Sequence, residues 1–214
     1  MACMICGHKL AILIDAEKEE VRICVACGYG RPSIREPMKY DEAYESKYLA
    51  YPEDEINKIR LNFVAAVGSL LDFGCGSGSF VRAARAAGFD AYGYDVNDFT
   101  SDLRPPDGFK PEIITAWDSF EHLTDEQQKE FFELAKSAKC VYVSIPDFES
   151  ASWNVDLDTW RHYRPAEHLH YYTAAALARR FKLEGFTAYK LDHGEDAVRK
   201  APWKRNILSM GFIR

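Results

Sequence analysis

The fold is decided by one stretch of sequence, Leu70-Leu71-Asp72-Phe73-Gly74-Cys75-Gly76-Ser77-Gly78-Ser79-Phe80. Its leucines and phenylalanine predict a buried strand, and its three alternating glycines predict a tight turn whose backbone can approach a ligand closely. The alanine-rich run that follows, Val81–Ala87, predicts a helix that ends at Gly88. We therefore expect a strand, a ligand-facing turn and a helix in direct succession, as in an α/β fold.

A second signal lies downstream at Asp95, which follows the expected strand Ala91–Tyr94. An acidic side chain about 20 residues beyond such a turn is typical of one that binds ribose hydroxyls. The dinucleotide pattern G-x-G-x-x-G would require glycine where the chain has Ser79, so a nicotinamide cofactor is disfavoured. Asp72, two residues before the first glycine, instead suits a cofactor that carries an ammonium group, a sulfonium and a ribose.

These residues resemble the first motif of the class I S-adenosylmethionine-dependent methyltransferases. That motif is an acid followed by three alternating glycines, and it is matched by Asp72, Gly74, Gly76 and Gly78. The resemblance implies a Rossmann-like parallel sheet with helices on both faces. It also implies that these four residues approach the methionine part of the cofactor, while Asp95 holds its ribose. The alternative is an ordinary glycine-rich turn between a strand and a helix.

Length and composition indicate one sizeable core with a small appendage, since single domains commonly have about 100–200 residues. Of the 214 residues, 47% are hydrophobic and 28% are charged, as in a soluble globular protein. No apolar run approaches the roughly 18 residues needed to cross a membrane, and the N-terminus does not resemble a signal peptide. We therefore expect a cytoplasmic protein with reduced thiols and no membrane contact.

The net charge of −6 argues against a broad electrostatic contact with nucleic acid, which depends on lysine and arginine. A local exception is the segment from Val198 to Arg214, which is basic and has no acid; it includes Arg199, Lys200, Lys204 and Arg205. This segment is either a solvated edge or a contact for a phosphate-bearing substrate. The expected partner is a small-molecule acceptor, and the oligomeric state is not predicted.

Four cysteines in the N-terminal segment form two Cys-x-x-Cys-Gly knuckles: Cys3, Cys6, Cys24 and Cys27. Their spacing falls in the range of zinc sites in which four thiolates surround the metal tetrahedrally. Two disulfides are the alternative, which a reducing compartment disfavours. Between the knuckles, Leu10–Ile14 and Glu20–Ile23 are expected to pair as a hairpin. Residues 1–31 are therefore predicted to form a zinc ribbon, which is either structural or recognises the substrate.

Residues 32–68 are expected to form a helical cover ahead of the core. Tyrosines recur every four residues in Tyr40–Leu49, so they would share one face of a helix. Packing is the usual explanation of such a stripe. In the resembled family, however, a helix before the first motif often covers the cofactor, which makes Tyr48 a candidate cofactor contact. A further helix is expected over Ile56–Val67.

The core, residues 69–214, departs from the resembled family after Asp95. Only Val96–Lys110 separates the second expected strand from the next apolar strand, Glu112–Trp117, so the third strand of the family is expected to be missing or vestigial. That strand usually supplies an acidic contact to adenine. Asp98 or Asp102 is either a substitute for this contact or a cap of a helix or turn.

The residues after the fourth expected strand form the second match to the family. They include Glu-His-Leu, within Trp117–Leu123, and resemble the small-molecule subgroup, among them quinone O-methyltransferases and sugar C-methyltransferases. Ligands of open parallel sheets bind beyond the carboxyl ends of the strands, so this segment is expected at the site. Asp118 or Ser119 would lie near the adenosine or the sulfonium, and His122 near the acceptor. The alternative is that the segment only caps the helix that follows.

Further elements are expected downstream: a helix over Thr124–Ala138 with a Thr-x-x-Gln capping pattern, a strand over Lys139–Ile145, a helix over Ala174–Glu184 capped by Thr173, and a final antiparallel pair, Thr187–Asp192 and Asn206–Ile213. The intervening stretch, Asp147–Leu169, is expected to be a long connection rich in aromatic and histidine side chains. Long connections of this kind are usually functional. The sheet would have seven strands, or six without the third.

Methyl transfer from a sulfonium requires an acceptor atom held in line with the methyl carbon, and a base where that atom is oxygen or carbon. The candidate bases are His122, His168 and His170. The sequence therefore predicts an S-adenosylmethionine-dependent methyltransferase that acts on a sugar, a nucleotide-sugar or a quinone-like acceptor. The alternatives are an RNA-base methyltransferase and a methyltransferase-fold subunit that binds without catalysis.

Overall fold

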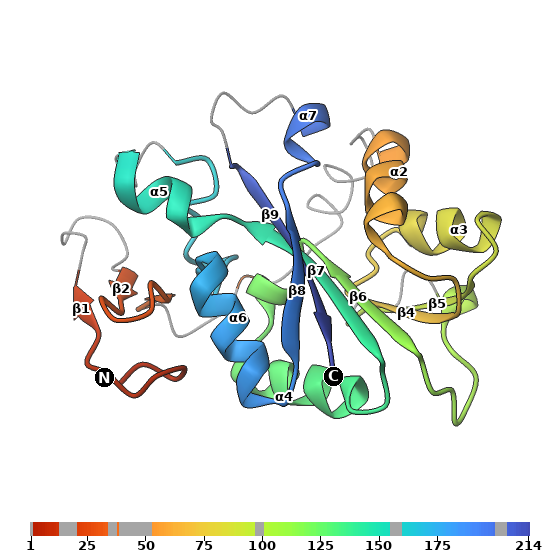
Figure 1. The fold of residues 1–214 in the computed structure, drawn as a ribbon, viewed down its shortest axis with the longest axis horizontal. Coiled ribbons are helices and arrows are strands. Elements are labelled where there is room, and N and C mark those ends of the chain that lie inside the picture. Colours follow the sequence, from red (N-terminus) through yellow and green to blue (C-terminus); the bar gives the residue numbers. More distant parts are fainter. Residues whose placement is uncertain are drawn as a thin grey trace.

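The computed structural model describes residues 2–12, 21–33, 38, 53–96, 101–154, 160–199 and 205–214. They form a small N-terminal sheet of three short strands and a central sheet of six strands with helices around it (Figure 1). In these ranges, no helix is both long enough and apolar enough to cross a membrane. The expected helix Tyr40–Leu49, Tyr48 within it, and Asp98 lie outside the described residues.

The central sheet has the strand order β5-β4-β6-β7-β9-β8. Its strands are β4 (Ser69–Phe73), β5 (Asp90–Tyr94), β6 (Ile113–Trp117), β7 (Cys140–Pro146), β8 (Thr187–Asp192) and β9 (Ile207–Ile213). The first four in this order are parallel, whereas β9 is antiparallel to both of its neighbours. The predicted parallel sheet with an antiparallel final pair is confirmed.

The helices are α2 (Glu53–Phe63), α3 (Ser79–Ala86), α4 (Asp125–Ala135), α5 (Phe148–Asn154), α6 (Ala174–Leu183) and α7 (Asp196–Arg199), with 3-10 turns η1 (Ser101–Leu103) and η2 (Phe120–His122). They cover both faces of the sheet because successive strand residues point to opposite sides. Leu71 belongs to the core cluster that contains Phe131 of α4, whereas Leu70 belongs to the cluster that contains Phe80 of α3. The strand β6 between these two layers is buried along its whole length.

Local signals account for where several helices begin. Thr124 caps α4 through the predicted capping box, since its side chain accepts a hydrogen bond from the Gln127 amide and its own amide donates to the Gln127 side chain. Thr173 caps α6 as expected. The helix expected over Ile56–Val67 instead begins at Glu53 and ends at Phe63. Its first turn is acidic, and acidic side chains are stabilised at a helix N-terminus.

The connection after β5 agrees with its prediction, whereas the connection after β7 agrees only in part. Between β5 and β6 the described residues contain the short turn η1 and no strand, so β5 lies at the edge of the sheet, as the prediction of a missing third strand requires. The expectation of a long connection over Asp147–Leu169 is wrong in part, because its first residues form α5. There the side chain of Asp147 accepts a hydrogen bond from the Glu149 amide, which begins the helix at once. The strand β7 also includes Pro146, which was expected to lie beyond it.

The N-terminal sheet consists of β1 (Ala11–Ile12), β2 (Val21–Ile23) and β3 (Gly30–Pro32), in that order and antiparallel. The predicted pairing of the first two strands is confirmed, and β3 is additional. This sheet and the two cysteine knuckles, residues 2–12 and 21–32, are called the ribbon below. Gly30 and Tyr171 exchange backbone hydrogen bonds of 2.8 and 2.9 Å, and ribbon side chains join the core cluster that contains Leu71 and Phe131. The ribbon is thus packed against the core.

Candidate functional site

The glycine-rich turn after β4 has backbone conformations that favour glycine. Gly74 has φ of 77°, and a side chain on it would place Cβ 2.5 Å from Cβ of Ser119, closer than real atoms approach. Gly76 has φ of 50° with no atom within 4 Å of where its Cβ would lie, so its backbone is accessible from that side. The turn therefore needs its glycines for two reasons. Gly74 leaves space for the Ser119 side chain that packs against it, and Gly76 leaves the backbone open to a ligand.

Three loops meet at the carboxyl ends of β4, β5 and β6. The Gly76 amide donates to Oδ2 of Asp95, 2.9 Å away, which joins the glycine turn to the end of β5. The hydroxyl of Ser119 donates to the backbone carbonyl of Phe73, 2.8 Å away, which joins the loop after β6 to the end of β4. These contacts place Asp95 and Ser119 beside the glycine turn, at the edge where open parallel sheets bind their ligands.

Asp72 supplies a buried carboxyl group beneath the same turn. Its side chain is 3% exposed, and Oδ1 accepts a hydrogen bond of 2.7 Å from the hydroxyl of Thr115 on the neighbouring strand. Burial raises the pKa of Asp72 to about 7, against the lowering effect of the Thr115 hydrogen bond and of the Arg60 charge. A carboxyl group in this state can accept a cationic partner at neutral pH.

Asp118 lies in a network of four charged side chains. Its Oδ2 is 2.6 Å from Nη2 of Arg60 and is also bound by Arg199. Both arginines bind Glu195 as well, at 3.0 Å from Arg60 and 2.6 Å from Arg199. Burial acts to raise the pKa of Asp118, but the two positive charges outweigh it and hold the pKa well below its usual range. The two acids and two bases balance one another, so the network carries no net charge.

Glu121, His122 and His168 form a cluster next to this network. Their nearest ligand atoms all lie within 4.8 Å of one another. The two imidazole rings meet edge to face with 4.8 Å between centroids, and Nε2 of His122 is 3.7 Å from Oε1 of Glu121. Burial lowers the pKa of both histidines, while burial and the nearby Asp118 raise that of Glu121. The structure thus brings together two of the three candidate bases.

His170 has a different environment. It is 1% exposed, its Nδ1 is 2.6 Å from the hydroxyl of Tyr29 in the ribbon, and its Nε2 is 2.8 Å from the carbonyl of Leu123. Because a carbonyl only accepts, Nε2 carries the proton and Nδ1 accepts from the tyrosine. Burial lowers the pKa of His170 to about 4, with a further contribution from the Arg31 charge. Both ring nitrogens are therefore engaged, Nδ1 with the ribbon and Nε2 with the core.

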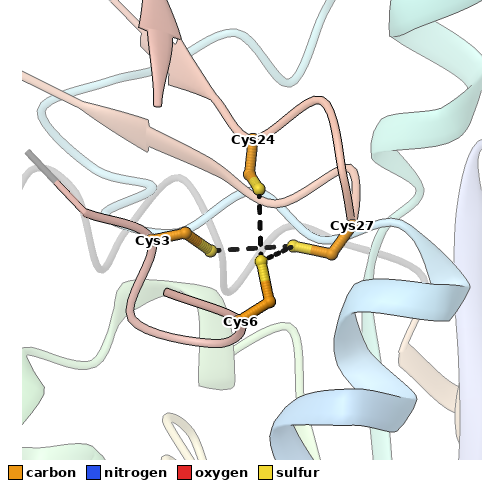
Figure 2. Close-up of side chains that lie close together, drawn as sticks. All are labelled: Cys3, Cys6, Cys24 and Cys27. Carbon is orange, nitrogen blue, oxygen red and sulfur yellow. Dashed lines mark hydrogen bonds between the residues drawn. The ribbon is translucent and has the colours of Figure 1, made fainter. Parts of the chain in front are cut away.

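The four cysteines of the ribbon point toward a common centre (Figure 2). None of the four forms a disulfide. The sulfur atom of Cys6 lies 3.4 Å from that of Cys24 and 3.7 Å from that of Cys27, and the sulfur atoms of Cys3 and Cys27 are 3.6 Å apart. Four sulfurs bound tetrahedrally at about 2.3 Å from one zinc ion would lie roughly 3.8 Å apart. The arrangement therefore fits a tetrahedral metal, and these separations are too long for disulfide bonds.

A model of the methyltransferase domain family matches residues 43–191, which is most of the chain. The chain belongs to the methyltransferase domain family. Among curated proteins, no relative was found.

Solved structures share the fold of this methyltransferase domain. An S-adenosylmethionine-dependent methyltransferase of Archaeoglobus fulgidus is 14% identical with a TM-score of 0.59, covering 82% of this chain and 100% of its own. The magnesium protoporphyrin IX methyltransferase of Synechocystis, solved with S-adenosylhomocysteine, is 16% identical with a TM-score of 0.54, covering 83% and 89%. The 1,6-didemethyltoxoflavin-N1-methyltransferase of Burkholderia thailandensis is 12% identical with a TM-score of 0.52, covering 95% and 98%.

Sequence reasoning missed part of the methyltransferase domain's charged network, because its members come from distant segments. Arg60 lies on α2, Asp118 follows β6, and Arg199 ends α7. The sequence did mark Arg199 as part of a basic segment, but its interpretation as a solvated edge is wrong at this position, where the side chain is 8% exposed. Asp102, one candidate for an adenine contact, is exposed on η1.

Proposed function

We propose that this chain transfers the methyl group of S-adenosylmethionine to a small molecule, such as a sugar, a nucleotide-sugar or a quinone-like acceptor. The observation that carries the proposal is the joining of three loops at the carboxyl ends of β4, β5 and β6, above the buried Asp72. When bound there, S-adenosylmethionine supplies a methyl group on a positively charged sulfur.

The chain's own residues offer contacts for the methionine part and the ribose of such a cofactor. Asp72 faces the ammonium group, and Gly74, Gly76 and Gly78 let the methionine part approach the backbone. Asp95, whose side chain is oriented by the Gly76 amide, accepts the ribose hydroxyls.

The candidate contacts on the adenosine side have different roles, because each is held by different partners in the structure. Ser119 is held against the glycine turn and lies near the adenosine or sulfonium. Asp118, committed to Arg60 and Arg199, acts there by fixing the loop in place. Tyr48, outside the described residues, is retained as a candidate cover of the cofactor.

Binding of the methyl acceptor is assigned to the cluster of Glu121, His122 and His168, which is called the acceptor cluster below. Direct transfer requires a nucleophilic atom held in line with the methyl carbon, and oxygen acceptors must also lose a proton. The His122 and His168 rings lie nearly at right angles, and their ligand atoms lie within 4.8 Å of each other and of Glu121, which suits contact with a single acceptor group. His170 is given a supporting role instead, since Tyr29 and Leu123 occupy both of its nitrogens.

The ribbon completes the proposal as a zinc site formed by Cys3, Cys6, Cys24 and Cys27. Thiolates at these separations suit Zn²⁺, and a segment this short has too little apolar surface to fold without a metal. The ribbon packs behind the acceptor cluster through Tyr29 and Gly30. This supports a structural role for the zinc.

A calorimetric titration tests the cofactor. S-adenosylhomocysteine should bind at one site per chain, and a screen with methyl-labelled S-adenosylmethionine should then transfer label to nucleotide sugars or quinone-like phenols. Label found in RNA instead would favour the RNA-base alternative. Binding without transfer to any acceptor would favour the non-catalytic subunit, and absence of binding at millimolar cofactor would contradict both enzymatic proposals.

Cofactor affinity is expected to rise with pH through about 7. The Asp72 carboxyl group, with a pKa of about 7, is protonated below this value and ionised above it, and the ammonium group binds the ionised form. Affinity for S-adenosylhomocysteine should therefore fall by up to about tenfold per pH unit below 7. Calorimetry between pH 5.5 and 8 measures this slope.

Two variants identify the residue responsible for this slope. Asp72→Asn keeps the hydrogen bond from Thr115 but cannot ionise, so its affinity should be weak and independent of pH. Asp107→Asn, at an exposed position, should keep the slope. A slope that persists in Asp72→Asn would show that another group causes it.

A further inference from the structure

We propose that Glu121, His122 and His168 form a site for a divalent transition-metal ion, and that this ion holds the oxygen of the methyl acceptor. The site would be separate from the cysteine cluster and would use two imidazole nitrogens and one carboxylate oxygen. Glu121 and His122 are neighbours on η2, and His168 reaches the same point from the segment before α6.

The carboxyl group of Glu121 has one buried oxygen without a hydrogen bond among the residues that the structure describes. The residue is 2% exposed, and within the described part of the chain its Oε2 is buried without a hydrogen bond. Its other oxygen is 3.7 Å from the His122 ring, which is longer than a hydrogen bond. A buried polar oxygen without a hydrogen bond is costly, and a bound cation would relieve that cost.

Both imidazoles are oriented by their other contacts, as metal ligands usually are. Nδ1 of His168 lies 2.8 Å from the carbonyl of His162, so Nδ1 carries the proton and Nε2 keeps its lone pair for a metal. His122 has a hydrogen bond with the backbone of Glu167. A backbone contact of this type fixes the ring direction without using a further side chain.

The charged side chains that the structure describes around the cluster pair with one another, so none of them opposes the binding of a cation. Asp118 and Glu195 are balanced by Arg60 and Arg199, as described above. Nearer to His122, the charge of Arg164 is balanced by Glu167, 3.1 Å away. Glu121 is left without a basic side chain within ion-pair distance among the described residues, apart from His122 itself. A cation bound to the Glu121 carboxyl group would therefore not compete with a described lysine or arginine side chain for it.

The ligand set selects the class of metal. Imidazole favours zinc, iron, cobalt and nickel, whereas all-oxygen sites suit magnesium and calcium, and a mixed set of two histidines and a carboxylate accepts ions such as Mn²⁺, Fe²⁺ and Co²⁺. Adjacent ligands of an octahedral ion lie roughly 3 Å apart, so modest inward rotation of the three side chains suffices. Three protein ligands leave other positions open.

The open coordination positions of the metal indicate which class of acceptor could bind, and this inference rests on the proposed function. A hydroxyl group bound to a divalent ion loses its proton more readily than a free one. The proton passes to solvent, the oxygen forms a bond to the methyl carbon, and the carbon–sulfur bond breaks to leave neutral S-adenosylhomocysteine. The acceptor would therefore be a compound with a hydroxyl, or two neighbouring hydroxyls, able to bind the metal, and the product would be its O-methyl ether.

Metal binding can be measured without any turnover. Protein with its zinc content verified by elemental analysis is freed of weakly held metal by dialysis and titrated with Mn²⁺, and the electron paramagnetic resonance signal of free Mn²⁺ is followed. One Mn²⁺ per chain should bind, and Glu121→Gln and His168→Gln should each weaken binding by about tenfold or more. Glu121→Gln preserves the backbone carbonyl that accepts from Leu169 and His170, so the fold is retained.

Asp147→Asn is the matched control. Asp147 is also a buried acid beside a histidine, 3.0 Å from His193, but it is outside the proposed site, so its variant should bind Mn²⁺ normally. Absence of a saturable Mn²⁺ site in the wild type, or equal binding by Glu121→Gln, would overturn the metal site. Thermal melting of each variant confirms that it is folded.

Activity then separates the metal proposal from the proposed function. With an identified acceptor, methyl transfer should depend on added Mn²⁺ and be restored by it after dialysis. Transfer at full rate without the ion would leave the methyltransferase function intact and contradict the role of the metal. Mn²⁺ binding in a protein that fails to bind S-adenosylhomocysteine would support the site and contradict the proposed function.

Discussion

Removal of metal from the cysteine cluster is expected to lower the melting temperature of the whole chain by roughly 6–12 °C. Structural zinc supplies much of the folding free energy of such a ribbon, because the apo segment lacks a core of its own. Loss of the ribbon would also uncover the core surface around Tyr171 and Thr173, whose contacts with Gly30 and Cys27 would be broken. If these contacts contribute about 3 kcal/mol, a shift of this size follows for a chain of this length.

The experiment compares melting curves before and after a strong chelator, with zinc measured in both samples. Cys24→Ser should reproduce the chelated behaviour, since it removes one of the four sulfurs. Cys140→Ser, in β7, should respond to the chelator as the wild type does. A metal-free sample that keeps its melting temperature would contradict the zinc proposal.

Gly74→Ala is expected to destabilise the chain by about 3 kcal/mol and to abolish measurable cofactor binding. The left-handed backbone costs about 1–2 kcal/mol for a residue with a side chain. The new Cβ would also lie 2.5 Å from Cβ of Ser119, and overpacking of this kind costs a further 1–3 kcal/mol. Relief of the clash must displace the loop after β6, so the three joined loops would separate.

Gly108→Ala isolates the backbone effect, because Gly108 has φ of 76° with nothing within 4 Å of its Cβ position. It should cost only the backbone strain and leave affinity for S-adenosylhomocysteine unchanged. Denaturant unfolding and calorimetry measure the two quantities. Equal destabilisation by both variants would show that the contact between Gly74 and Ser119 matters little.

The sequence predicts the parts of this structure that depend on neighbouring residues. The glycine turn, the Thr124 capping box and the two cysteine knuckles are each defined within a few positions, and the structure has the turn and the cap where they were expected. Between β5 and β6, the lack of a third strand among the described residues could be predicted for the same reason, because a short stretch of chain sets an upper limit on what it can contain.

The rest depends on residues that only the fold brings together. Nothing local to Arg60 indicates that it pairs with Asp118, and the partner of His170 is a tyrosine far away in the ribbon. Three histidines that look alike in sequence therefore divide into a pair at the acceptor cluster and one at the ribbon contact. That division follows from tertiary hydrogen bonds, which residue spacing does not encode.

The segment His168–Tyr171 imposes a constraint on how this chain can vary in length. Its first residue lies in the acceptor cluster, its third contacts Tyr29, and its last pairs with Gly30. Leu169 and His170 also donate their amides to the carbonyl of Glu121. An insertion or deletion of a single residue in this segment would misalign the acceptor cluster and the ribbon together, so relatives that share both should keep this spacing unchanged.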